Sequence, residues 1–392
     1  MFTPIPVTVL SGFLGAGKTT LLRHLLKEEH GLKIAVIENE FSDAGVDTQL
    51  LGSEPVQVMT LSNGCVCCTI HTDLTKALVL LLERLDSGEI AFDRLVIECT
   101  GLADPAPILH TVMLHPYLVL RYRLESVVTL IDSINGLSTL DAHEEARRQA
   151  AVADRLVLTK TDLIESDGQR ETFDALRDRL NHLNPGARRL DAHQGEATPA
   201  NLFNAGLYNP DSKIPDVAKW LNAEAYEPEA VHDHSHLHGH HHHHHGHDHH
   251  HHDHGHSHEH DVNRHDDKIR AFTLSTSRPV PASALEMFLD LLRSAHGPKL
   301  LRVKGIVQIA EDPDRPVVIH GVQHVFHPPA TLDAWPDGDH STRMVFITYD
   351  LAEGFVRKMF EAFSGALLPD TPDPKAMTDN PLAISGFTSP PR

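Results

Sequence analysis

The sequence predicts an α/β protein, in which a mostly parallel sheet covered by helices is followed by a small α+β domain. Three observations carry this prediction. Short apolar runs alternate with helical patterns in the first half, the composition turns almost entirely to His, Asp, Gly and Ser near residue 232, and amphipathic strands surround one helix further on. We therefore predict four parts, which are 1–210, a linker 211–266 containing the His-rich segment 232–265, a domain 267–355, and a helix remnant with a Pro-rich tail 356–392.

Six candidate strands lie in the first part, and their apolar residues face both sides. They are 6–10, 33–38, 56–61, 94–98, 126–132 and 154–159. Helical patterns such as 18–29 and 74–86 separate most of them. Strands that are buried on both faces and joined by helical crossovers form parallel sheets.

The His-rich segment contains 20 of the 33 histidines, at 232, 234, 236, 238, 240–245, 247, 249–252, 254, 256, 258, 260 and 265. It has almost no apolar residues to offset its ordering entropy, so we predict a disordered linker. Neutral imidazoles bind Zn²⁺, Ni²⁺ or Cu²⁺ and release them on protonation. The segment is thus either a weak, pH-sensitive metal store or a solvated spacer.

The last domain is predicted to hold one helix against antiparallel strands. The strand candidates are 268–275, 300–310, 315–327 and 342–350. Ser283 is placed to cap the helix, and Glu286 to complete a capping box. Four histidines of this domain form either a further metal or client-binding face or ordinary surface residues, and parity places the first two on one strand face: His320, His324, His327 and His340.

Bulk composition narrows the class of partner. The formal net charge is −20, which argues against nucleic acid or an anionic membrane as the main partner. No uncharged apolar run of about 18 residues and no leader pattern is seen, so a cytoplasmic location is expected.

Three of the four cysteines, Cys65, Cys67 and Cys68, lie within four positions. This spacing is a poor disulfide framework and favours metal binding or redox chemistry.

The strongest motif is GFLGAGKT, Gly12 to Thr19, which fits G-x-x-x-x-G-K-[ST] between an apolar strand and a helix. Its backbone N–H groups wrap phosphate oxygens, Lys18 neutralises the β and γ phosphates, and the Thr19 hydroxyl binds Mg²⁺. The predicted phosphate-binding residues are Gly12, Gly15, Ala16, Gly17, Lys18, Thr19 and Thr20.

Two later strand ends complete the predicted nucleotide site. Glu98 is placed to hold the magnesium shell, and the backbone N–H of Gly101 to meet the γ-phosphate. Thr159, Lys160 and Asp162 follow another strand, where the Asp162 carboxylate accepts from N1–H and the exocyclic amine of guanine. Adenine has no such donor pair, so GTP is favoured over ATP.

The chain resembles the CobW family of metal-handling GTPases, and within that family it most resembles the zinc-chaperone members. The segments that carry the resemblance are, in order, SGFLGAGKTTLLRHLL, IAVIENEF, NGCVCC, RLVIECTGLADP and LTKTD. The resemblance implies a P-loop GTPase domain, a CxCC metal site coupled to nucleotide state, and delivery of metal to a client metalloprotein driven by GTP hydrolysis. IENEFSD and ECTGLADP differ from the cobalamin-pathway branch and favour zinc over cobalt. Thr159 stands where many GTPases carry Asn, which leaves one hydrogen bond of the base loop open.

Three thiolates fall one short of the four ligands of a closed structural zinc site. The fourth comes from a carboxylate such as Glu38, Glu40 or Asp43, from water, or from an arriving client. We take Glu38 as a ligand and Asp47 as approaching Mg²⁺ or the attacking water, so that hydrolysis loosens a metal ligand. Cys99 is assigned to packing.

Other functions stay open at this point. One alternative is a cobalt chaperone of cobalamin synthesis. Another is a GTP-switched protein that stores or senses metal without handing it over, and a third is a P-loop kinase, for which no acceptor-binding motif is evident. The oligomeric state is not indicated by the sequence.

Overall fold

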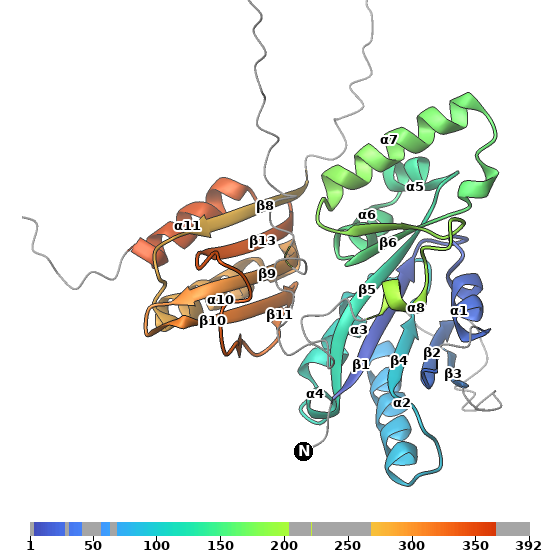
Figure 1. Ribbon diagram of the computed structural model, residues 1–392, viewed down its shortest axis with the longest axis horizontal. Helices are drawn as coiled ribbons and strands as arrows, with labels where there is room; N and C mark the ends of the chain where they lie inside the picture. Colours follow the sequence, from blue (N-terminus) through green and yellow to red (C-terminus); the bar gives the residue numbers. More distant parts are fainter. Residues whose placement is uncertain are drawn as a thin grey trace, which may run out of the picture.

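The computed structural model describes residues 4–27, 31–40, 56–62, 69–203, 221 and 268–365. The predicted His-rich linker and the Pro-rich tail lie outside the described residues. Two domains lie side by side, with the first running from blue to green and the second in orange and red (Figure 1). No helix in the described ranges is long and apolar enough to cross a bilayer.

The first domain is built on a seven-stranded sheet in the order β3-β2-β4-β1-β5-β6-β7, in which every neighbouring pair is parallel. This confirms the predicted parallel sheet, and the short seventh strand is an addition. The strands are β1 (Ile5–Gly12), β2 (Ile34–Glu40), β3 (Val56–Ser62), β4 (Arg94–Glu98), β5 (Tyr122–Asp132), β6 (Arg155–Thr159) and β7 (Arg188–Asp191).

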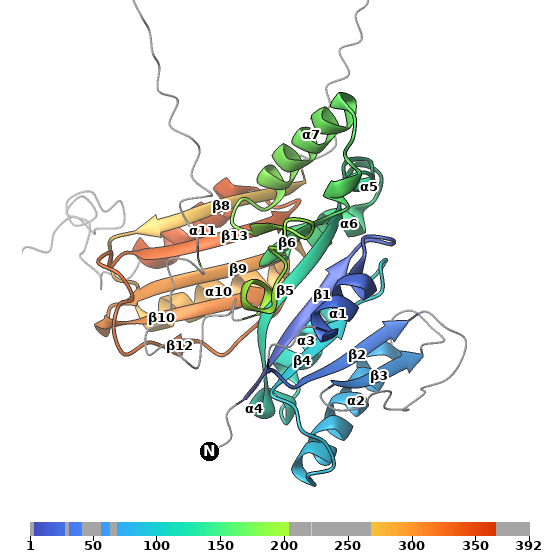
Figure 2. The same cartoon turned by 45° about the vertical axis from the view of Figure 1, so that its right-hand side comes forward.

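Helices cover both faces of this sheet (Figure 2). Alternate residues of β4 show why: Leu95 and Ile97 pack with α2, α3 and α5 to α7, whereas Val96 packs with α1 and α8. The helices are α1 (Lys18–Lys27), α2 (Thr69–Asp86), α3 (Ala106–Leu114), α4 (Leu118–Arg121), α5 (Gly136–Ala142), α6 (Glu144–Ala151), α7 (Asp167–Leu183) and α8 (Pro199–Leu202).

The second domain is a six-stranded sheet with the main order β11-β10-β9-β13-β8, and all its recorded strand pairs are antiparallel. Along β13, Met344 and Phe346 pack under the helices, whereas Val345 and Ile347 face the opposite side. The elements are β8 (Ile269–Thr276), α10 (Ala282–His296), β9 (Leu300–Ile309), β10 (Asp312–Val322), β11 (Val325–Phe326), β12 (Ala330–Thr331), β13 (Thr342–Tyr349) and α11 (Glu353–Gly365).

Two local expectations for this domain are wrong. Ser283 does not cap α10, because the helix begins one residue earlier, at Ala282, and the Ala282 amide donates to the carboxylate of Glu311 at 3.0 and 3.2 Å. His320 and His324 do not share a strand face, because β10 ends at Val322. His324 instead lies against His110 of the first domain, with ring centroids 4.5 Å apart.

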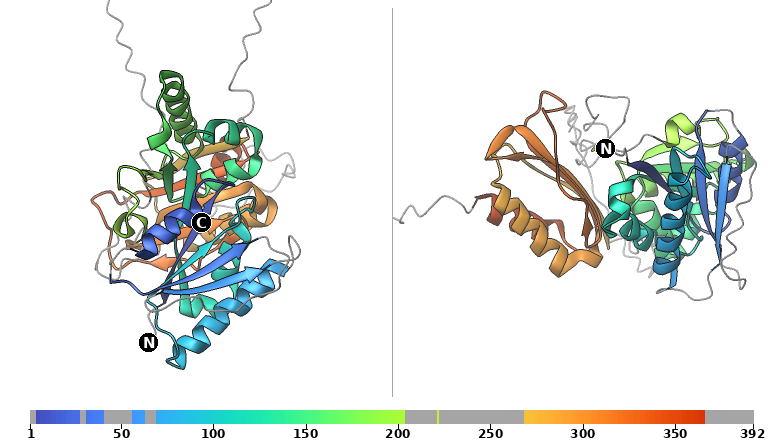
Figure 3. Two further views of the ribbon diagram at one scale, coloured as in Figure 1. Left: turned by 90° about the vertical axis from the view of Figure 1, so that its right-hand side faces the viewer. Right: turned by 90° about the horizontal axis from the view of Figure 1, so that it is seen from below.

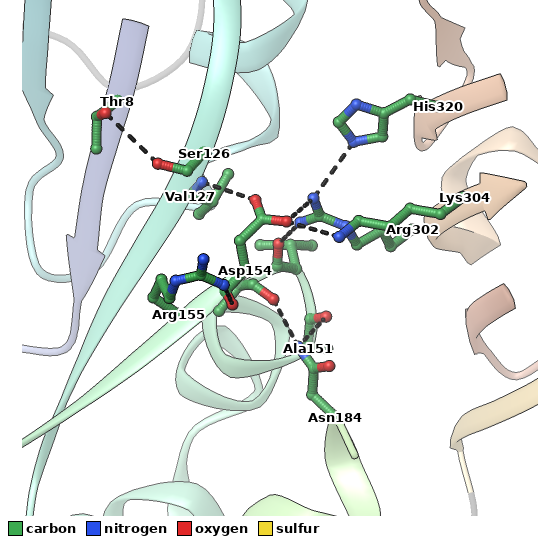
Figure 4. A network of polar contacts seen from close by, with 12 residues as sticks. Thr8, Ser126, Val127, Ala151, Asp154, Arg155, Asn184, Arg302, Lys304 and His320 are labelled. Carbon is green, nitrogen blue, oxygen red and sulfur yellow. Dashed lines mark hydrogen bonds and ion pairs between the residues drawn. The ribbon is translucent and has the colours of Figure 1, made fainter. Parts of the chain in front are cut away.

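The second sheet carries α10 and α11 on one face and meets the first domain with the other (Figure 3). A buried group of polar residues joins the two domains, and we call Asp154, Arg302, Lys304 and His320 the docking cluster (Figure 4). Asp154, just before β6, accepts hydrogen bonds from Arg302 at 2.6 Å and from Lys304 at 2.8 Å, and Arg302 also lies 3.3 Å from His320. Burial alone raises the pKa of Asp154, but Arg302 and Lys304 outweigh it and hold that pKa far below its usual range.

Candidate active site and nucleotide pocket

The predicted phosphate loop lies between β1 and α1, at the carboxyl edge of the parallel sheet. β1 pairs with β4 on one side and β5 on the other, so the loop stands over the middle of the sheet. Gly15 and Gly17 have φ of 72° and 93°, in the left-handed region that favours glycine. Lys18 turns its Nζ back toward the loop and donates to the carbonyls of Gly12 at 2.8 Å and Phe13 at 3.1 Å. This loop is a cradle of backbone groups at a helix N-terminus, which suits a polyphosphate.

Thr19 and Glu98 come together beneath this loop. The Thr19 hydroxyl donates to Glu98 Oε1 at 2.8 Å, although the two residues are far apart in sequence. Burial lowers the pKa of Lys18, and the nearby Glu98 carboxylate opposes this shift. A hydroxyl and a carboxylate beside a phosphate cradle are the hard oxygen ligands that Mg²⁺ takes, so these two residues fit a magnesium site.

Gly101 follows β4 and lies directly against the phosphate loop. A Cβ at this position would come within 2.7 Å of the backbone nitrogen of Leu14. Only glycine therefore lets this stretch of backbone approach the loop so closely. The structure thus brings Gly101 to the phosphate loop, as a backbone contact to a terminal phosphate requires.

The predicted base-binding residues line a cavity of about 440 Å³ beside α1. Lys160, in a left-handed conformation, extends its Nζ to Asp132 Oδ2 at 2.7 Å. Thr159 donates to the carbonyl of Ala16 at 2.9 Å, so its hydroxyl ties the base loop to the phosphate loop. The lining residues are Gly17, Thr20, Leu21, His24, Thr159, Lys160, Asp162, Leu163, Ala192, His193, Gly195, Ala197 and Thr198.

The loop after β7 completes this cavity and is missed by the sequence analysis. Asp191 organises it, because its Oδ1 accepts from the Thr161 hydroxyl at 2.7 Å and from the amide of His193 at 2.9 Å. The Asp132 carboxylate, at the end of β5, accepts hydrogen bonds from Lys160 Nζ and from the amides of Ile134 and Asn135. Burial alone raises the pKa of Asp132, but these hydrogen bonds outweigh it and lower that pKa. The sequence signal for this loop is a short polar strand that ends in Asp191, with Gly195 four residues later.

The predicted metal ligands Cys65, Cys67 and Cys68, together with Asp47 and the alternative Asp43, lie outside the described residues. Glu38 is described at the end of β2, where it is the register partner of Glu98 on β4. Within the described ranges, no group of three or more His, Cys, Asp or Glu residues is arranged to hold a metal ion.

Cys99 is a packing residue, as expected from the sequence. It is 1% exposed and belongs to the main core cluster. Burial raises the pKa of its thiol to about 12, so it is protonated at neutral pH. A buried, neutral thiol of this kind is not available as a metal ligand.

A parallel sheet with a glycine-rich phosphate loop after its central strand defines a P-loop nucleotide-binding protein. Comparison with known families agrees. Residues 6–190 match the CobW/HypB/UreG nucleotide-binding domain, and residues 269–364 match the cobalamin synthesis protein cobW C-terminal domain.

One relative covers nearly the whole chain, and others cover about half of it. The chain is 37% identical to the zinc chaperone YjiA of Escherichia coli, over 91% of this chain and 98% of that protein. It is 35% identical to the zinc-regulated GTPase metalloprotein activator 1 of Schizosaccharomyces pombe, over 57% and 50%. The crystal structure of Zn(II)-bound YjiA GTPase from E. coli superposes with a TM-score of 0.63 at 31% identity, covering 92% of this chain and 99% of that one. The chain therefore belongs to the CobW family and is a P-loop GTPase, which confirms the resemblance, the fold class and the enzyme class predicted from the sequence.

Proposed function

We propose that this protein is a zinc metallochaperone, which binds Zn²⁺ at Cys65, Cys67 and Cys68 and transfers it to a client metalloprotein in a process that requires GTP hydrolysis. Its relatives support the metal, because YjiA is named a zinc chaperone and has been solved with Zn(II) bound. GTP and Mg²⁺ are the other cofactors. The alternative of a cobalt chaperone has less support, because none of the relatives reported above is named for cobalt.

The observation that carries the proposal is the register pair Glu38↔Glu98. Register partners on neighbouring strands lie about 5 Å apart and project to the same face of the sheet. Glu98 already meets Thr19 at the proposed magnesium position. A carboxylate that we assign to the transferable metal therefore stands one strand away from a carboxylate that we assign to Mg²⁺.

The CxCC motif belongs to the connection that starts at this same edge. β3 ends at Ser62, parallel to β2, and α2 begins at Thr69, directly after Cys68. Thiolates are soft ligands, which suit zinc. The three thiols thus follow, by three to six residues, the end of the strand that pairs with the Glu38-bearing β2.

In the hydrolytic step, we assign Lys18 to the phosphate charge, Thr19 and Glu98 to Mg²⁺, and Asp162 to guanine. The backbone N–H of Gly101 meets the γ-phosphate, and Asp47 approaches the magnesium shell or the attacking water. Mg²⁺, when bound, neutralises charge that develops on the phosphates. Loss of the γ-phosphate then relaxes the connection after β2 and weakens the hold of Glu38 on zinc.

The test is the rate at which zinc passes from the full chain to an apo-metalloenzyme of defined zinc requirement. We expect transfer to be faster with GTP and Mg²⁺ than with a non-hydrolysable GTP analogue, which keeps zinc bound. It is also expected to be faster than with GDP, because the weaker hold then leaves less of the chain loaded with zinc. Glu38→Gln is expected to reduce the advantage of GTP, whereas Glu171→Gln, an exposed control on α7, leaves it unchanged. Equal rates with GTP and GDP would instead favour the second candidate, a protein that stores or senses metal without transfer.

A further inference from the structure

Gln149 on α6 makes a buried contact that the nucleotide chemistry described above does not use. Its side chain is 1% exposed, and its Nε2 donates to the carbonyls of Gly101 at 3.2 Å and Ala103 at 2.9 Å. Because both neighbours are acceptors, the amide nitrogen must face them. Oε1 has no hydrogen-bond partner among the described residues, and an unpaired buried acceptor lowers stability.

The backbone held by Gln149 is the stretch that touches the phosphate loop, Gly101 to Asp104, which we call the 101–104 segment. Gly101 lies too close to Leu14 of that loop to carry a Cβ. Under the proposed function the Gly101 N–H meets the γ-phosphate, and the present inference rests on that assignment. A shift of the segment by a fraction of an ångström then changes a contact that GTP makes and GDP lacks.

Helix α6 is in turn held at both ends by the second domain. At its start, the Tyr349 hydroxyl donates to Glu144 Oε2 at 3.0 Å, and the Arg148 guanidinium lies 4.7 Å from the centre of the Tyr349 ring. Just past its end, Arg302 of the docking cluster donates to the carbonyl of Val152. The helix that carries Gln149 therefore cannot shift without disturbing the interface shown in Figure 4.

The second domain also reaches the 101–104 segment directly. Gln323, in the turn after β10, donates through Nε2 to Asp104 Oδ2 at 3.2 Å. Asp104 lies 3.8 Å from Arg148, so it is contacted by both the second domain and α6. The segment is thus held by one amide of its own domain at Gly101 and Ala103 and by one amide of the other domain at Asp104.

We propose that Gln149 is a positioning residue for GTP hydrolysis, which holds the 101–104 segment against the phosphate loop, and that the second domain sets this position through Gln323 and α6. The second domain thereby takes part in discriminating GTP from GDP. Gln149 itself acts only through the backbone of the segment.

The test compares nucleotide affinities of full-length variants with Mg²⁺. Gln149→Met keeps the length of the side chain and removes the donor. We expect it to weaken binding of a non-hydrolysable GTP analogue about ten-fold and to lower kcat by a similar factor, with GDP affinity unchanged. Thr129→Val is the matched control, because the Thr129 hydroxyl donates to the backbone carbonyl of the same Gln149 at 2.9 Å. It is expected to lower the melting temperature but to leave the ratio of the two affinities unchanged.

Gln323→Met probes the contribution of the second domain without altering a core residue. It is expected to shift the same ratio in the same direction, about three-fold, whereas Gln308→Met on β9 does not. Equal losses for the triphosphate and GDP in folded Gln149→Met, or no loss in either, would overturn the positioning role. An unchanged ratio in Gln323→Met would overturn the part assigned to the second domain.

Gly101→Ala separates this inference from the assignment on which it rests. If Gly101→Ala weakens the triphosphate more than GDP while Gln149→Met does not, Gly101 keeps its role and the inference fails. If Gly101→Ala leaves the ratio unchanged, the γ-phosphate assignment itself is wrong, and the inference falls with it.

Discussion

The two sheets of this protein are buried in different ways, and they serve different purposes. The parallel sheet has helices on both faces, and its chemistry collects at one edge, where β1, β4 and β6 end in Gly12, Glu98 and Thr159. The antiparallel sheet has α10 and α11 on one face, and the first domain packs against part of the other face. Parallel strands bring distant residues to a common edge, whereas the antiparallel sheet presents a broad face to a neighbour.

The second domain therefore does not form its core independently of the first domain. Its inner face contributes Leu301, Val322 and Ile347 to the core cluster of the first domain. The docking cluster adds charges that are far from water. The second domain therefore depends on the first for part of its burial, and the first depends on it for the partners of Asp154.

The largest expected effect is on this dependence. Asp154→Asn removes the carboxylate that faces the two buried cations, Arg302 and Lys304. Breaking a buried pair in this way costs about 3–5 kcal/mol of folding stability. Denaturant unfolding measures the loss, and Asp174→Asn, from an exposed pair on α7, is the control. A loss no larger than that of the control would contradict the role of Asp154 in holding the two domains together.

The next largest effect is expected on GTP hydrolysis at the phosphate loop. Lys18→Ala removes the cation that we assign to the β and γ phosphates. GTP hydrolysis is expected to fall by about 10²–10³-fold, the range seen when a preorganised electrostatic contact is lost. Phosphate release under single-turnover conditions measures it, and circular dichroism verifies the fold. A variant that keeps more than half of the activity would contradict the role of Lys18.

A smaller effect is expected at the base cavity. Asp162→Asn replaces an acceptor by a group that also donates, so the match to guanine is lost and a match to the C2 oxygen of xanthine is gained. We expect GTP affinity to fall about 100-fold and xanthosine triphosphate affinity to rise. Competition binding with labelled GDP measures both. Parallel losses for the two nucleotides would remove Asp162 from base recognition.

The smallest effect is on the pH dependence of stability. Burial lowers the pKa of His327 from 6.5 to about 4, so between these values the unfolded chain binds a proton that the folded chain does not. Stability is then lost as the pH falls through this window, by roughly 2–3 kcal/mol. Urea unfolding between pH 7 and pH 4.5 should show a shallower fall for His327→Gln than for the chain with His327, and His182→Gln on the exposed side of α7 should not. An identical slope in His327→Gln would contradict the prediction.

Much of this architecture is visible in the sequence because it is local. Apolar runs identify six strands of the parallel sheet, and the glycine pattern identifies the phosphate loop. The apolar pattern does not predict β7, because this strand has a single apolar residue among Arg188, Arg189 and Asp191. The cap of α10 is mistaken because its acceptor, Glu311, comes from a different element.

Contacts between distant elements are beyond a single sequence. Gln149 looks like an ordinary helical residue, and only the fold places it beside Gly101. Thr159 reads as a departure from the usual Asn, yet its hydroxyl makes the bond that links the base loop to Ala16. Charge and pattern likewise give no indication that Arg302 and Lys304 are buried against Asp154.

In the proposed function, nucleotide state controls how tightly zinc is held, through the sheet edge that Glu38 and Glu98 share. The most direct measurement is the Zn²⁺ affinity of the full chain with a non-hydrolysable GTP analogue and with GDP, each with Mg²⁺. We predict tighter binding with the triphosphate, by about ten-fold, and loss of the difference in Glu38→Gln. Equal affinities in the two nucleotide states would contradict the account.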